Sequence, residues 1–133
     1  MGPGMSAHRV VIDVPGVRHG NLPIPMGVRV GKLVYSSGIH GMDPVSQEIP
    51  DDPAAQIGLV FRHMRTIVEN AGGSTGDIGF VLVRLRDAGL RDLVNAAWVE
   101  MFPDPLDRPA RNVQLQELGW NMVIHLEMTA VLP

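Results

Sequence analysis

The chain has 133 residues, of which 45% are hydrophobic and 19% are charged, and its formal net charge is −3. This composition predicts one globular domain with a substantial core and excludes a disordered chain. The acidic balance, without any basic run, disfavours nucleic acid as a partner, and no apolar stretch is long enough to span a membrane.

Cysteine is absent. Its absence excludes disulfide bonds, thiolate catalysis and cysteine-based zinc sites, and it fits a reducing compartment, so we expect a cytoplasmic protein. The first residues lack the charged and apolar segments of a signal peptide. Because a second methionine follows at Met5, we expect residues 1–6 to be disordered or left over from recombinant expression. The expected domain then spans residues 7–133.

The N-terminal third predicts three strands. Residues 7–14 are rich in β-branched side chains, which predicts a strand that ends at Pro15-Gly16. Residues 20–26 have prolines at alternate positions, so this segment is extended rather than helical. Residues 27–38 predict a hairpin with a tight turn at Gly31-Lys32, and a loop then runs from 39 to 50.

The middle of the chain predicts two helices with a strand between them. Asp52 and Pro53 mark the first helix start, because aspartate caps free amides and proline suits the first turn. Apolar residues then recur at helical spacing as far as Ala71. The strand at 78–87 is nearly all apolar at its centre, which predicts cover on both faces. The second helix spans 90–101.

Two further strands complete the chain. Pro109 has a fixed φ and no amide donor, which suits a strand's first position, so Arg111 lies just inside this strand. The last strand, at 122–132, places His125 and Glu127 on one face. The resulting order, β-β-β-α-β-α-β-β, indicates an α+β fold with a mixed six-stranded sheet and both helices on one face.

Two helices leave the other face of such a sheet uncovered. We expect that face to carry Val113, Leu115 and further apolar side chains, and association of several copies is the simplest way to cover them. Tyr35, Trp98 and Trp120 are expected to be packing residues rather than a platform for a ligand.

Four segments resemble the Rid (YjgF-type) family of small imine deaminases, and they cover nearly everything from Gly27 onward in the family's order. The resemblance implies a chorismate-mutase-like subunit and a homotrimer with clefts between neighbouring subunits. The four segments are the hairpin that ends at Ser37-Gly38, the first helix from Asp52-Pro53-Ala54-Ala55-Gln56 to Glu69-Asn70-Ala71-Gly72, the second helix with Asn95, and the strand opening Pro109-Ala110-Arg111.

The resemblance also implies a reaction on enamines and imines of small carboxylic acids. Water adds to the imine carbon, ammonia leaves and a keto acid remains, without a metal or an organic cofactor. In this resemblance Arg111 holds the substrate carboxylate and the backbone near Gly38 lines the cleft, with Ser37, His40 and Asn95 as further ligand-binding candidates. No metal is expected, because the histidines are far apart in sequence and lack supporting carboxylate spacing.

The chain differs from the family at the residue that positions the attacking water and at the family's tyrosine. These differences mark a divergent branch outside the standard RidA deaminases. The family's glutamate in the last strand aligns with His125, the next acidic position with Glu127, and the family's tyrosine falls near Ile24. His125 or Glu127 is therefore the catalytic candidate. The alternative is a non-catalytic protein that binds a small carboxylate metabolite in the same cleft. Ribonuclease and chaperone-like activities are attributed to some members; the acidic balance argues against the first, and the sequence does not address the second.

Overall fold

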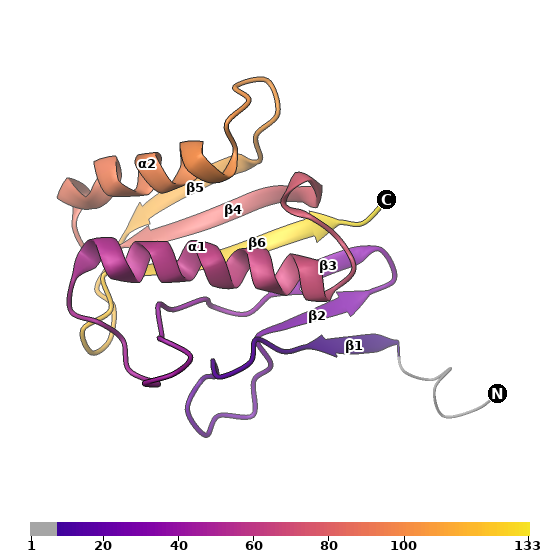
Figure 1. Cartoon of the computed structure of the whole chain (residues 1–133), viewed down its shortest axis with the longest axis horizontal. Helices are drawn as coiled ribbons and strands as arrows, with labels where there is room; N and C mark the ends of the chain where they lie inside the picture. Colours follow the sequence, from indigo (N-terminus) through magenta and orange to yellow (C-terminus); the bar gives the residue numbers. More distant parts are fainter. Residues whose placement is uncertain (1–7) are drawn as a thin grey trace.

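The structure, a computed structural model, describes residues 8–133, so the expectation for residues 1–6 lies outside the described residues. Its core is one six-stranded sheet with two helices on one face (Figure 1). The predicted α+β architecture and the predicted order of elements are confirmed. No helix in residues 8–133 is long and apolar enough to cross a membrane.

The sheet combines an antiparallel meander with one parallel pair. Its spatial order is β1-β2-β3-β6-β4-β5, in which only β4 and β5 run parallel. Gly31 has φ +61° in the predicted hairpin turn, a conformation that glycine adopts without strain. The strands are β1 (Arg9–Ile12), β2 (Gly27–Val30), β3 (Leu33–Ser36), β4 (Ile78–Leu85), β5 (Ala110–Leu115) and β6 (Ile124–Val131).

The helices α1 (Pro53–Asn70) and α2 (Arg91–Met101) lie over the sheet (Figure 1). The side chain of Asp52 accepts a hydrogen bond from the amide of Ala55 at 3.0 Å, which is the predicted cap of α1. Short 3₁₀ turns, η2 (Thr75–Asp77) and η3 (Ala88–Leu90), precede β4 and α2. The core lies between the helices and the sheet. The central strands contribute their alternating buried residues to it: Val81, Val83, Leu85, Ile124, Leu126 and Met128.

The face of the sheet opposite the helices carries His125, Glu127 and Thr129, which alternate with the buried residues of β6 as predicted. We call this face the open face. Two expectations about it are wrong. Val113 pairs with the buried Val83, so Val113 and Leu115 point toward the helices instead. Alternation shows which residues share a face, but it does not show which face the helices cover.

The second error concerns which apolar side chains remain exposed. Tyr35 is 41% exposed and Phe80 is 39% exposed, so Tyr35 is not a core residue and residues 8–133 leave the open-face side of β4 uncovered at Phe80. Cross-strand pairing places both beside Thr129. They belong to an open-face patch of exposed apolar residues: Val11, Leu33, Tyr35, Phe80 and Val131.

Candidate functional site

A pocket of about 580 Å³ opens where the loop before β2, the β3–α1 loop and the β5–β6 loop meet. Three histidines line it together with several apolar side chains. Residues from segments far apart in sequence thus meet at one end of the sheet. The lining includes His19, His40 and His125, together with Leu22, Met42, Ile49, Trp120 and Met122.

His125 and Gly38 are in close contact at this end of the sheet. A Cβ atom on Gly38 would overlap Cε1 and Nε2 of the His125 ring, so only glycine fits while the ring keeps its position. The carbonyl of Gly38 accepts a hydrogen bond from Nε2 of His19 at 2.6 Å. Ile39 exchanges two backbone hydrogen bonds with Leu126, which fixes Gly38 beside the start of β6.

Two further histidines hold the loops around the pocket. His40, which is 7% exposed, donates from Nε2 to the carbonyl of Arg18 at 2.9 Å, and its ring meets that of His19 edge to face. The hydrogen bonds of both rings therefore link the loop before β2 to the segment after β3. Within residues 8–133, no group of three or more His, Asp or Glu side chains is placed to hold a metal ion.

The surroundings of His125 favour its neutral form. Burial lowers the pKa of His125 most, the Arg84 guanidinium lowers it further, and the Glu127 carboxylate opposes them. Arg84 and Glu127 form an ion pair at 3.3 Å on the open face. A neutral imidazole is able to accept a proton, whereas Glu127 is already engaged by a cation.

We expect the stability of the protein to decline as the pH falls below 6.5. Burial lowers the pKa of His40, His63 and His125 below the ordinary value of 6.5, so the unfolded chain binds these protons more readily than the folded chain. The free energy of unfolding is then constant above this pH and decreases below it. Thermal denaturation between about pH 7 and about pH 5, a window above the ordinary carboxylate range, measures this loss. An unchanged melting temperature across that window would contradict the lowered pKa values of these histidines.

Arg111 lies at a second place, on the helix-facing side of β5. Its Nη2 donates to Oδ1 of Asn95 at 2.8 Å, and its guanidinium carbon is 4.9 Å from the centroid of the Trp98 ring. Nη1 is buried and has no hydrogen-bond partner among residues 8–133. Burial lowers the pKa of Arg111, and the charge of Arg91 adds to this. The side chain is therefore oriented by the protein while one of its donors is unused.

Among the predicted site residues, Glu127 is held in its ion pair with Arg84 and does not line the pocket, and the other six fall into two groups. Ser37, Gly38 and His40 lie with His125 around one end of the sheet, and the amide of Ser37 donates to the carbonyl of Met26. Arg111 and Asn95 form the other group. Arg111 pairs through Val81 with the buried Met128, so its side chain leaves the opposite face from that of His125. A single chain does not bring the two groups together.

The packing role predicted for two tryptophans fits Trp98 but not Trp120. Trp98 is 7% exposed and contacts Phe102, as expected for a packing residue, but its ring also supports Arg111, which helical spacing does not predict. Trp120 is 87% exposed, so its expected packing role is wrong. The sequence feature that indicates its exposure is its place in the Gly119-Trp120-Asn121 turn, outside any apolar stripe.

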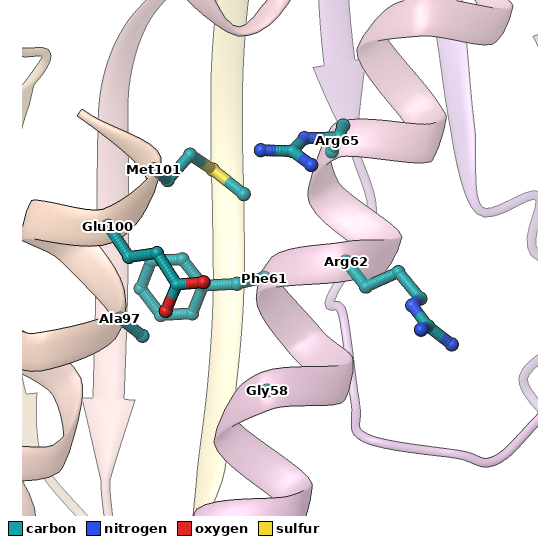
Figure 2. A pocket seen from close by; sticks show the side chains of 7 residues that line it. All are labelled: Gly58, Phe61, Arg62, Arg65, Ala97, Glu100 and Met101. Atoms are coloured by element: carbon teal, nitrogen blue, oxygen red, sulfur yellow. The ribbon is translucent and has the colours of Figure 1, made fainter. Parts of the chain in front are cut away.

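A second hollow, of about 190 Å³, lies between α1 and α2 on the outer side of the helices (Figure 2). Arg65 and Glu100 extend over it, whereas Arg62 points away from it. All three side chains are exposed, and none of the predicted site residues lines the hollow. Arg62 is therefore a suitable control position for substitutions in the candidate site.

Comparisons with known proteins agree with this fold. The family model described as Endoribonuclease L-PSP matches residues 24–132. The 2-iminobutanoate/2-iminopropanoate deaminase of Escherichia coli is 32% identical over 111 residues, which cover 82% of this chain and 87% of that protein. The 3-aminoacrylate deaminase RutC of Acinetobacter baylyi is 34% identical over 90 residues, covering 67% and 70%.

Solved structures extend the likeness to the whole fold. RidA from the Antarctic bacterium Psychrobacter sp. has a TM-score of 0.84 at 28% identity, covering 92% of this chain and 99% of that one. The YjgF gene product of E. coli has a TM-score of 0.82 at 29% identity, covering 92% and 98%. The fold thus defines a small α+β protein of the chorismate-mutase-like class. The chain belongs to the Endoribonuclease L-PSP family, the Rid (YjgF-type) family that its sequence resembles.

Proposed function

We propose that this protein hydrolyses 2-imino acids, or the corresponding enamines, to keto acids and ammonia. Two of the relatives named above, those from E. coli and Acinetobacter baylyi, are named as deaminases, and each name denotes a small carboxylate that carries a reactive carbon–nitrogen group. The observation that carries the proposal in this chain is Arg111, whose guanidinium is oriented by Asn95 and keeps a buried donor without a partner among the described residues. A planar guanidinium in a partly desolvated position matches a carboxylate.

In the proposed reaction, water adds to C2 of the imine while His125 accepts a proton from it. The protonated His125 passes this proton to the nitrogen, which completes the carbinolamine. The hydroxyl proton of the carbinolamine is then transferred through His125 to the amino group, and the C–N bond breaks as the C=O bond forms and ammonia leaves. His125 suits this role because burial and Arg84 keep its pKa low. Glu127 is the weaker candidate, because Arg84 holds it in an ion pair.

The proposed site forms between copies of the chain. Arg111 and the group around Gly38 lie on opposite faces of one sheet, so a site that uses both needs Arg111 from one copy and Gly38 from the next. The open-face patch supports such an assembly, because exposed apolar patches on small proteins are typical of interfaces. We propose a homotrimer, a closed assembly in which each copy contributes to two identical interfaces.

Deamination of 2-iminobutanoate, generated in the assay, tests the proposal. The wild-type protein and the control Arg62→Ala are expected to accelerate release of the keto acid over its spontaneous rate. His125→Glu restores the residue type that the family places there, and we expect it to remain active. Absence of acceleration by both the wild type and His125→Glu would exclude a 2-iminobutanoate deaminase.

A non-catalytic carboxylate-binding protein is the second candidate. It is favoured by the histidine at the family's glutamate position and by the engagement of Glu127 with Arg84. Such a protein would show a higher melting temperature with keto acids but no turnover. Activity gained only in His125→Glu would indicate the same outcome, a retained pocket that serves another ligand or reaction.

Asn95→Ala is expected to raise KM for the imine about threefold to tenfold, with little change in kcat. The substitution removes a hydrogen bond that orients the guanidinium of Arg111, and such bonds contribute about 0.5–1.5 kcal/mol. Steady-state kinetics measure the effect. Val99→Ala, on an exposed part of the same helix, is the control. An unchanged KM in Asn95→Ala would show that Arg111 does not depend on this contact for binding.

A further inference from the structure

Trp120 combines an exposed side chain with an unfavourable backbone conformation. Its indole is 87% exposed, and its φ is +51°, in the left-handed region that disfavours residues with a side chain. Packing into the core does not explain why a tryptophan stands at this position, and the turn alone does not require one. Strained backbone of this kind is common at binding sites, where the surrounding structure holds it in place.

Hydrogen bonds fix the loop that carries Trp120. Nη2 of Arg86 donates to the carbonyls of Leu118 and Trp120 at 2.7 and 2.8 Å. The side chain of Asn121 donates to the carbonyl of Ile49 at 2.7 Å and to Asp51 at 2.9 Å. The loop is therefore tied both to the end of β4 and to the β3–α1 loop, so Trp120 is held in a defined position before any ligand arrives.

The buried side chain of Gln56 adds a third attachment. Its Nε2 donates to the carbonyls of Pro50 and Asn121 at 2.8 Å each, and its Oε1 accepts from the amide of Val123 at 3.0 Å. Gln56 is fully buried near the start of α1. The loop is consequently anchored to the core through Gln56, while the side chain of Trp120 remains exposed.

Trp120 lines the same pocket as His125. The volume of about 580 Å³ lies in the range of about 300–1,000 Å³ that is typical of sites for drug-sized ligands. The two-carbon side chain of 2-iminobutanoate would leave most of this space empty. Charged groups of both signs, Arg18, Glu48 and Asp51, lie around the pocket, and the charge is too mixed to favour a strongly charged side chain.

We propose that Trp120 forms the aromatic wall of a subsite for the substrate's side chain, and that the preferred substrates are 2-imino acids with a large apolar or aromatic side chain. The inference rests on the proposed deaminase function, because it places the reactive carbon near His125 and the side chain toward Trp120. An aromatic substituent would gain ring–ring contact with the indole and apolar contact with Leu22, Ile49 and Met122.

The test compares the imines of phenylalanine and 2-aminobutyrate, each generated by an amino acid oxidase, in the full-length protein. Wild-type kcat/KM is expected to be about tenfold or more higher for the aromatic imine. Trp120→Ala should lower this value about tenfold while changing that for 2-iminobutanoate less than about twofold. Trp120→Phe should retain most of the preference, and Val99→Ala is the control for an exposed apolar residue outside the pocket.

Trp120→Gly separates binding from folding. Glycine accepts a φ of +51°, so this variant is expected to have a melting temperature no lower than that of the wild type while losing the preference for the aromatic imine. Size-exclusion chromatography of Trp120→Ala provides a second check. A loss of the wild-type oligomer would assign Trp120 to a subunit interface and overturn the subsite.

The outcomes distinguish the subsite from the deaminase. Equal turnover of the two imines, or an equal loss of both in Trp120→Ala, would overturn the subsite and leave the deaminase in place. If neither imine is turned over, the deaminase fails, and binding of phenylpyruvate and 2-oxobutyrate decides the subsite. Tighter binding of phenylpyruvate that is lost in Trp120→Ala supports it, and equal or absent binding overturns it.

Discussion

Arg111→Ala is expected to lower kcat/KM for 2-imino acids by about 30-fold to several thousandfold, because removing one partner of a desolvated charge pair costs about 2–5 kcal/mol. Nη1 of Arg111 is buried without a partner among residues 8–133, so a bound carboxylate is the group that would satisfy it. The loss of stability should be modest, since the contact of Arg111 with Trp98 in this partly desolvated position is worth between about 0.5 and about 2 kcal/mol. Steady-state kinetics and thermal denaturation measure the two effects.

Two further substitutions make this result specific. Arg111→Lys keeps the charge but loses the planar fork, so activity should lie between those of the wild type and Arg111→Ala. Arg62→Ala removes an exposed arginine that points away from the helix–helix hollow, and it should leave turnover unchanged. Turnover by Arg111→Ala within about twofold of the wild type would be inconsistent with a carboxylate clamp.

Gly38→Ala is expected to abolish turnover and to destabilise the protein by about 1–3 kcal/mol, the usual cost of overpacking. The added methyl group would overlap the His125 ring, so the ring must leave its position or the backbone must shift. Either change also disturbs the Gly38 carbonyl, which accepts from His19. Chemical denaturation measures the stability, and the 2-iminobutanoate assay measures turnover.

A double-mutant cycle identifies the cause of this effect. In the His125→Ala background there is no ring to overlap, so Gly38→Ala should cost much less there than in the wild type. Gly58→Ala is the matched control: a Cβ there has no neighbour within 4 Å, and alanine in a helix is favoured over glycine by about 1 kcal/mol. An equal cost of Gly38→Ala in both backgrounds would locate the strain elsewhere.

The helix cap, the hairpin turn and the alternation along β6 follow from local sequence patterns, and the structure has all three. Asp52 caps α1 as its chemistry predicts, and Gly31 takes the left-handed conformation that the hairpin turn requires. The alternation along β6 correctly places His125 and Glu127 on one face. These features depend on residues a few positions apart, so the sequence alone contains the information.

The candidate site depends on contacts that sequence spacing does not encode. Asn95 and Trp98 meet Arg111 only because β5 runs parallel to β4 beneath α2, and the register of that pair decides which side Arg111 takes. Gln56 lies within the first turn of an amphipathic helix, yet it is fully buried and bonds to Asn121 far along the chain. Trp120 is 87% exposed, although long-range hydrogen bonds from Arg86 and Gln56 anchor its loop.

Activity of mixed oligomers tests the central claim most directly, namely that the site joins Arg111 of one copy to Gly38 and His125 of another. Arg111→Ala and Gly38→Ala chains carrying different tags are co-expressed, and oligomers that contain both chains are purified. Each parent oligomer should be inactive. In a mixed trimer one interface of three has both halves intact, which predicts about one third of wild-type turnover. Doubly tagged oligomers with no activity would contradict a site shared between copies.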